Sequence, residues 1–134
     1  MGLILMRLLL DTHTFVWALT DPDRLSLRAA SLIRDLRNTV LVSAASAWEI
    51  ATKHRLGRLP GAGPVIAAYP RHLTTLRAEE LPIRSTHALK AGTFGVDHAD
   101  PFDRILAAQA ILESARLVTN DRALASFPDL DVVW

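Results

Sequence analysis

Acidic residues that directly follow apolar runs are the most chemically informative feature of this 134-residue sequence. Asp11 ends the run LLLD, and Asp121 follows the run LVTN in the same way. Glu49 stands in SAWEIATKHR, and Asp100 and Asp103 lie three residues apart in HADPFDR. Carboxylate oxygens suit hard cations such as Mg²⁺ and Mn²⁺. If the fold gathers these acids, the expected chemistry is metal-assisted hydrolysis of a phosphodiester, in which the ion activates a water.

Each acid also has an ordinary structural explanation. Asp11, Asp100 and Asp121 are good N-cap residues, and Glu49 suits an exposed helix face. Asp103 fits capping less well, because Glu or Gln is the usual reciprocal cap three residues into a helix. Acids gathered at one place would repel each other by roughly 4 kcal/mol per close pair at a surface-like dielectric. Caps and a cation site therefore both stay open at this point.

Short apolar runs alternate with helical patterns along the chain. Strands are expected at 8–10, 40–42, 80–83, 117–119 and 132–133. Helices are expected at 12–19, 26–36, 44–56, 65–76 with a kink or split at Pro70, 85–91, and from Pro101 onward. This alternation predicts an α/β fold, a three-layer α/β/α arrangement with a central parallel sheet of about five strands. Ligands bind at the carboxyl ends of such strands, where Asp11 and Asp121 fall.

The composition narrows the class of protein. Half of the residues are hydrophobic, the net charge is +1 and there is no cysteine, so cysteine-based zinc sites and thiol chemistry are excluded. We expect a single domain over residues 1–134 and a cytoplasmic location. Arg7 interrupts the first apolar stretch, which argues against a signal peptide or a membrane span. Translation starting at Met6 would leave residues 1–5 as a non-native or extended N-terminus, and the sequence leaves both starts open.

Four motifs together resemble the PIN-domain ribonucleases, most closely the VapC toxins of bacterial type II toxin–antitoxin pairs. They are LLLDTHTFVWAL, SAASAWEIATKHRLGRL, HADPFDRILAAQA and LVTNDRAL, and the resemblance runs from Arg7 to Trp134. It implies a PIN-like fold and an endoribonuclease that depends on Mg²⁺ or Mn²⁺. It also implies RNA as the substrate, a homodimer, and a cognate antitoxin protein that inhibits the enzyme.

The resemblance assigns roles to individual residues. The catalytic, metal-binding quartet is Asp11, Glu49, Asp103 and Asp121. Asp100 matches a secondary metal ligand. Thr119 matches a hydroxyl that holds an acid or a water, and Thr12 and Asn120 are supporting residues.

Basic and aromatic residues suggest contacts with partners. A weak prediction of RNA binding falls on Lys53, Arg55, Arg58, Arg104 and Arg122, although basic residues at a helix end also stabilise its dipole. The histidines His13, His87 and His98 receive no catalytic role. If residues 12–19 and 43–59 form a groove, an antitoxin helix could lie in it.

Three other classes of protein are alternatives to the nuclease. A haloacid dehalogenase-type phosphatase needs a second Asp two residues after Asp11, where this chain has His13. A receiver domain needs an acidic pair at that place, which is missing. The alternative that remains is a catalytically silent PIN-like adaptor that binds RNA or protein.

Overall fold

The computed structural model describes residues 5–134, which form one five-stranded sheet flanked by helices. The strands are β1 (Arg7–Leu10), β2 (Thr39–Ser43), β3 (Ala78–Leu81), β4 (Arg116–Val118) and β5 (Val132–Val133). The α-helices are α1 (Thr12–Thr20), α2 (Leu27–Arg34), α3 (Ala44–Arg55), α4 (Gly63–Ala67), α5 (Tyr69–Thr75), α6 (Ser85–Thr93) and α7 (Pro101–Leu112). Two 3₁₀ helices, η1 (Pro22–Arg24) and η2 (Arg122–Ser126), complete the described elements.

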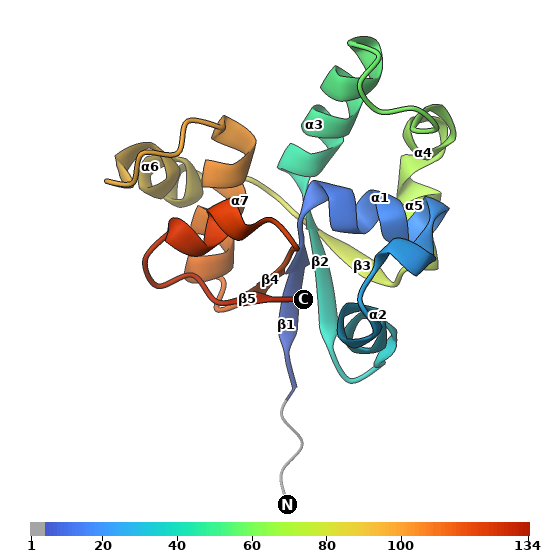
Figure 1. The fold of residues 1–134 in the computed structure, drawn as a ribbon, viewed down its shortest axis with the longest axis horizontal. Helices are drawn as coiled ribbons and strands as arrows, with labels where there is room; N and C mark the ends of the chain where they lie inside the picture. Colours follow the sequence, from blue (N-terminus) through green and yellow to red (C-terminus); the bar gives the residue numbers. More distant parts are fainter. Residues whose placement is uncertain (1–4) are drawn as a thin grey trace, which may run out of the picture.

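Helices cover both faces of the sheet, as the alternating pattern predicts (Figure 1). Side chains alternate across a strand, so Leu8 and Leu10 of β1 pack on one face and Leu9 packs on the other. The first face is covered by α1, α2, α4 and α5 and the second by α7 and η2. The three-layer α/β/α fold with a parallel sheet is therefore confirmed.

The strand order places a switch point beside β1. The order is β3-β2-β1-β4-β5, and every pairing is parallel. The chain builds outward from β1 through β2 and β3, then returns to the other side of β1 to form β4. The amide of Asp11 donates to the carbonyl of Val118 at 3.1 Å, which ties the ends of β1 and β4 together. Parallel sheets bind ligands at such a point.

Most of the predicted elements are present, with shifted ends. β3 was expected at 80–83 but pairs with β2 over Ala78–Leu81, because Pro82 has no amide to donate and Ile83 is 43% exposed. β4 ends at Val118, so Thr119 lies just beyond it. α2 ends at Arg34, two residues earlier than expected, and Leu36 is 71% exposed.

The helix expected at 65–76 is two helices. Ala68, with φ −130°, separates α4 from α5, and Pro70 lies in the first turn of α5, where its missing amide costs no hydrogen bond. The predicted end of α3 is confirmed, since Gly57 has a φ of 72°. The 3₁₀ helices were not predicted.

Two further predictions concern the N-terminal residues and membrane-spanning segments. The extension proposed for residues 1–5 falls mostly on residues 1–4, which lie outside the described residues. Within the described part, no helix is long and apolar enough to cross a membrane.

Candidate active site

The predicted acids line one pocket at the carboxyl ends of the strands. It has a volume of about 420 Å³. Its lining includes Asp11, Thr12, Glu49, Lys53, Asp100, Asp103, Asn120 and Asp121. Asp11 and Thr12 follow β1, Glu49 and Lys53 come from α3, Asp100 and Asp103 open α7, and Asn120 and Asp121 follow β4. Thus four separate segments of the chain bring their acids to the switch point.

Asp11 is both a helix cap and a site residue. One of its carboxylate oxygens accepts from the Thr14 amide at 2.8 Å and caps α1, while the other accepts from the Thr119 hydroxyl. The Thr119 hydroxyl in turn accepts from the Asp121 amide at 3.0 Å. Asp11 and Thr119 are both buried. Thr119 therefore links the acid after β1 to the loop after β4.

Glu49 is not on an exposed helix face. Its side chain is buried, with the residue 4% exposed, and it accepts a hydrogen bond from the Thr12 hydroxyl. The Lys53 ammonium lies 2.6 Å from the other Glu49 oxygen, one helical turn along α3. Thr12 also contacts Ser46 at 3.0 Å. Glu49 is thus held in place by a hydroxyl on one side and by a cation on the other.

Asp103 is an acid of the pocket whose surroundings shift its pKa. Burial raises its pKa above the ordinary value, and the charges of Asp100 and Glu49 act in the same direction. The His98 ring lies 2.9 Å from Asp103 and opposes this rise in pKa. Asp100 caps α7 by accepting from the Phe102 amide at 2.9 Å, which confirms the predicted N-cap. The two acids of the first turn therefore differ, since Asp100 is exposed and Asp103 is partly buried.

The loop after β4 carries the most open part of the pocket. Asn120 and Asp121 are exposed, and Asp121 accepts from the Ala123 amide at 2.9 Å. This bond caps η2, so the capping explanation also holds for Asp121.

The basic residues separate into different environments. Lys53 lines the pocket, whereas Arg55, Arg58 and Arg122 are exposed and do not line it. Arg104 does not support the predicted contact with RNA. Its guanidinium donates to the main-chain carbonyls of Ala91, Phe94, Val96 and His98 at 2.8 to 3.2 Å, so it holds the connection from α6 to α7.

His98 is the residue that sequence reasoning missed. It was left out of the site because a single histidine is commonly a surface group, yet its ring contacts Asp103. Its place in the motif HADPFD, five residues before Asp103, was the available signal. His13 is exposed and lines the pocket, while His87 is buried and accepts from the Arg84 amide through Nδ1, away from the site.

The donor chemistry of the pocket fits a hard divalent cation. The five acids offer only oxygen atoms, which suit Mg²⁺ or Mn²⁺. Burial, and to a smaller extent the charges of Asp100 and Glu49, raise the pKa of Asp103, and a bound cation would offset this cost of ionisation. Within residues 5–134, no group of three or more acids or histidines is arranged to hold a metal ion as it stands.

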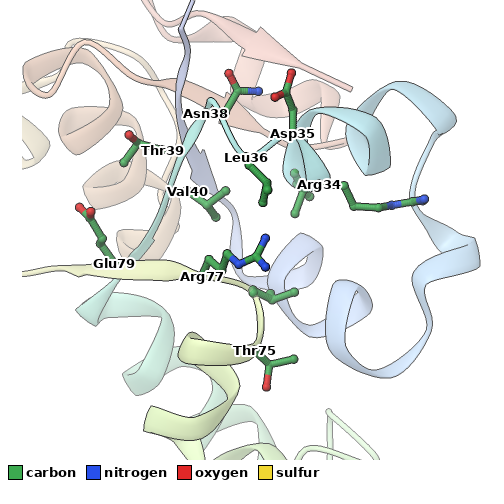
Figure 2. A pocket seen from close by; sticks show the side chains of 11 residues that line it. Arg34, Asp35, Leu36, Asn38, Thr39, Val40, Thr75, Arg77 and Glu79 are labelled. Carbon is green, nitrogen blue, oxygen red and sulfur yellow. The ribbon is translucent and has the colours of Figure 1, made fainter.

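A second pocket lies at the opposite, amino end of the sheet (Figure 2). Its volume is about 300 Å³, and it lies where α2 and α5 end and β2 and β3 begin. Arg77 turns its guanidinium into this pocket, while the Arg34 side chain extends away from it. Glu79 and Asp35 also line it, so charges of both signs surround this space. It contains none of the predicted site residues.

Known proteins are similar to this chain in sequence and in fold. Ribonuclease VapC22 of Mycobacterium tuberculosis is 33% identical over 131 residues, covering 94% of this chain and 97% of the relative. Ribonuclease VapC16 of the same organism is 39% identical over 57 residues, covering 42% of this chain and 40% of that relative. In structure, the chain is similar to VapBC2 of Rickettsia felis, with a TM-score of 0.70, 21% identity, and coverage of 96% and 98%.

Two further solved structures agree with this fold. VapBC-1 of nontypeable Haemophilus influenzae gives a TM-score of 0.60 at 18% identity, covering 96% of this chain and 97% of that one. PAE2754 of Pyrobaculum aerophilum gives 0.53 at 21% identity, covering 96% and 84%. Residues 8–130 match the PIN domain family, so the resemblance noted in the sequence is confirmed and the chain belongs to that family.

Proposed function

We propose that this protein is a metal-dependent endoribonuclease that acts as the toxin of a toxin–antitoxin pair. The observation that carries the proposal is the set of five carboxylates lining one pocket at the switch point, with Asp11 anchored by Thr119. Membership of the PIN domain family and the name of the relative ribonuclease VapC22 support the nuclease activity.

The residues of the pocket have different proposed roles. Asp11, Glu49, Asp103 and Asp121 would hold Mg²⁺ or Mn²⁺, with Asp100 as a secondary ligand. When bound, such an ion supplies activation of water and neutralisation of charge on the phosphodiester. Thr119 orients Asp11, Thr12 orients Glu49, and His98 orients Asp103.

Lys53 has a second role in this proposal. Its ammonium pairs with the buried Glu49 but keeps 28% of the side chain exposed on the pocket. A cation at that position attracts the phosphate of an RNA chain toward the acids, which would otherwise repel it. Asn120, exposed at the mouth of the pocket, is proposed as a polar contact to the same substrate.

An antitoxin protein and a second copy of the chain are the proposed partners. The relatives are named VapC, and two structures with this fold are named VapBC. Trp48 on α3 is 64% exposed and contacts Phe102 edge to face, with ring centroids 4.8 Å apart, beside the pocket. An exposed aromatic residue at this place suits a protein interface. The proposed location is the cytoplasm, where RNA substrates are found.

The test is cleavage of a mixed pool of structured RNAs by the purified protein without antitoxin. Reactions contain Mg²⁺, Mn²⁺ or EDTA, and the Asp11→Asn and Asp103→Asn variants are assayed beside the wild type. We expect cleavage that needs metal and that both substitutions abolish. A folded wild type that cuts no RNA in either metal contradicts the proposal.

Metal binding distinguishes the adaptor function from the nuclease function. A divalent ion that binds only the folded protein raises the melting temperature. An adaptor would bind RNA or protein equally well in EDTA and would show no such rise. The retained acids of the pocket favour the nuclease.

A further inference from the structure

A groove adjoins the acidic pocket. It has a volume of about 460 Å³ and lies between α1, η1 and the loop that follows α3. His13 and Trp17 line both spaces, so the groove and the pocket share a wall. This is the region between residues 12–19 and 43–59 where the sequence suggested a groove. A chain that enters the pocket has this groove as its continuation.

The charge of the lining changes along this continuous surface. The pocket is lined by carboxylates, whereas Arg24 of η1 and Arg58 after α3 line the groove. Both arginines are exposed, and neither forms an ion pair with another described residue within 4.0 Å. Asp21 is the acid that shares the groove with them. Two guanidiniums in a groove next to the proposed cleavage site are suited to bind neighbouring phosphates of the same RNA strand.

Aromatic rings are the lining that the groove shares with the pocket. The Arg24 guanidinium carbon lies 4.8 Å from the centroid of the Trp17 ring. The His13 ring lies 5.8 Å from Trp17 on a tilted plane, and Trp134 supports Trp17 edge to face at 6.2 Å. Unstacked RNA bases bind on such aromatic and guanidinium planes.

We infer that this groove binds one unpaired nucleotide of the RNA strand next to the scissile phosphate. The base stacks against the Trp17–Arg24 pair, and Arg58 binds the adjoining phosphate. This inference rests on the proposed function, which it deepens by assigning the residues that hold the nucleotide next to the cut. Duplex RNA is disfavoured because its bases are already stacked and cannot reach the groove.

The lining favours RNA over a protein helix as the occupant. A helix docks through apolar anchors spaced along its face. Here the apolar and aromatic members are Val16, which is buried, together with Trp17, Leu59 and Pro60, while two arginines and Asp21 provide the exposed charge. A protein that occupies the groove is therefore treated as a competing outcome of the test.

The experiment measures binding without cleavage. An Asp11→Asn protein is titrated into a fluorescein-labelled, mixed-sequence, single-stranded RNA of ten nucleotides, and anisotropy is followed at 50 and 200 mM salt. In this background, Arg24→Gln and Arg58→Gln are compared with Arg34→Gln, an exposed arginine at the other end of the sheet. We expect each groove variant to weaken binding about tenfold and to reduce the salt slope by about 0.7, with the control unchanged. Trp17→Leu should also weaken binding about tenfold.

The outcomes separate this inference from the proposed function. If the wild type cuts RNA while both arginine variants bind as tightly as the parent, the groove assignment is overturned and the nuclease stands. Equal loss of affinity in the Arg34→Gln control would also overturn it, because the effect would be general charge. Variants that keep RNA affinity but lose binding of a purified antitoxin would make the groove a protein interface. If the parent binds no RNA and the wild type cuts none, the proposed function fails with it.

Discussion

The two ends of the sheet treat charge in opposite ways. At the carboxyl end, burial raises the pKa of Asp103, and Asp11 and Glu49 are buried among hydroxyls. At the amino end, the side-chain and backbone hydrogen bonds from Arg37 lower the pKa of the half-buried Asp35 to about 2. One end buries an acid, Asp103, whose ionisation is costly, and the other pairs its acid with a neighbouring arginine.

This difference teaches how to choose between two cavities on one fold. Both ends carry a pocket, and their volumes, about 420 and 300 Å³, are similar. The carboxyl-end pocket is lined by acids from four segments, whereas the amino-end pocket mixes Arg34 and Arg77 with Asp35 and Glu79. Acids that a fold gathers against their own repulsion indicate a functional site, because perturbed carboxylates cluster where chemistry needs them.

The sharpest way to break this comparison is to neutralise one acid at each end. Asp11→Asn should lower the rate of RNA cleavage at least about 100-fold, the effect of removing a group that acts on the transition state. Asn is also a good N-cap, so α1 keeps its Thr14 bond. Asp35→Asn should leave the rate within about twofold. Equal effects of the two variants on the initial rate would contradict the assignment of the site.

Removing the link between β1 and β4 should cost stability as well as activity. Thr119→Val keeps the shape of the side chain but leaves the buried carboxylate of Asp11 and the Asp121 amide without this hydroxyl. We expect the free energy of unfolding to fall by about 2 kcal/mol. Thr119→Ser keeps the hydroxyl and should lose less than half as much. Urea unfolding of both variants measures this, and equal losses would mean that the methyl group, not the hydroxyl, matters.

Asp103 tests whether the carboxyl end is under electrostatic strain. Because burial raises its pKa, its ionisation destabilises the fold; this cost is absent below its ordinary pKa of 3.8 and develops as pH rises through the raised pKa. Asp103→Asn should therefore raise the melting temperature of the metal-free protein at pH 7 but not at pH 3. Asn still offers an oxygen to His98. A variant that melts lower at pH 7 would contradict this account.

The smallest expected effect lies away from both ends. Burial raises the pKa of Tyr69 on α5 to about 12, and its hydroxyl has no hydrogen-bond partner among the described residues. The unfolded chain ionises near pH 10, so stability should fall as pH rises from about 10 toward 12. Tyr69→Phe should remove part of that fall and change the free energy of unfolding at pH 7 by less than about 1 kcal/mol. Urea midpoints at pH 7 and 11 check both values.

Local patterns predicted the framework of the molecule well. Apolar runs located the strands, Asp100 and Pro101 located the start of α7, and the acids after β1 and β4 pointed to the switch point. These features depend on a few neighbouring residues, which sequence reasoning can see. The split between α4 and α5 followed in the same way from Pro70.

Contacts that depend on the path of a loop were not predictable. His98 reaches Asp103 only because the connection after α6 folds back, and Arg104 is used by that connection rather than by RNA. The burial of Glu49 likewise depends on Thr12, which is 37 residues away in the chain. A single sequence carries no direct signal for such long-range pairs.

The bond between Thr119 and Asp11 also has a consequence in time. The two residues are 108 positions apart, so β1 leaves the ribosome long before β4 can pair with it. Domains gain their long-range contacts only when the later segment has been made. A growing chain that has not yet reached β4 has no complete site, so the cluster of acids can form only after the segment through Asp121 has been synthesised.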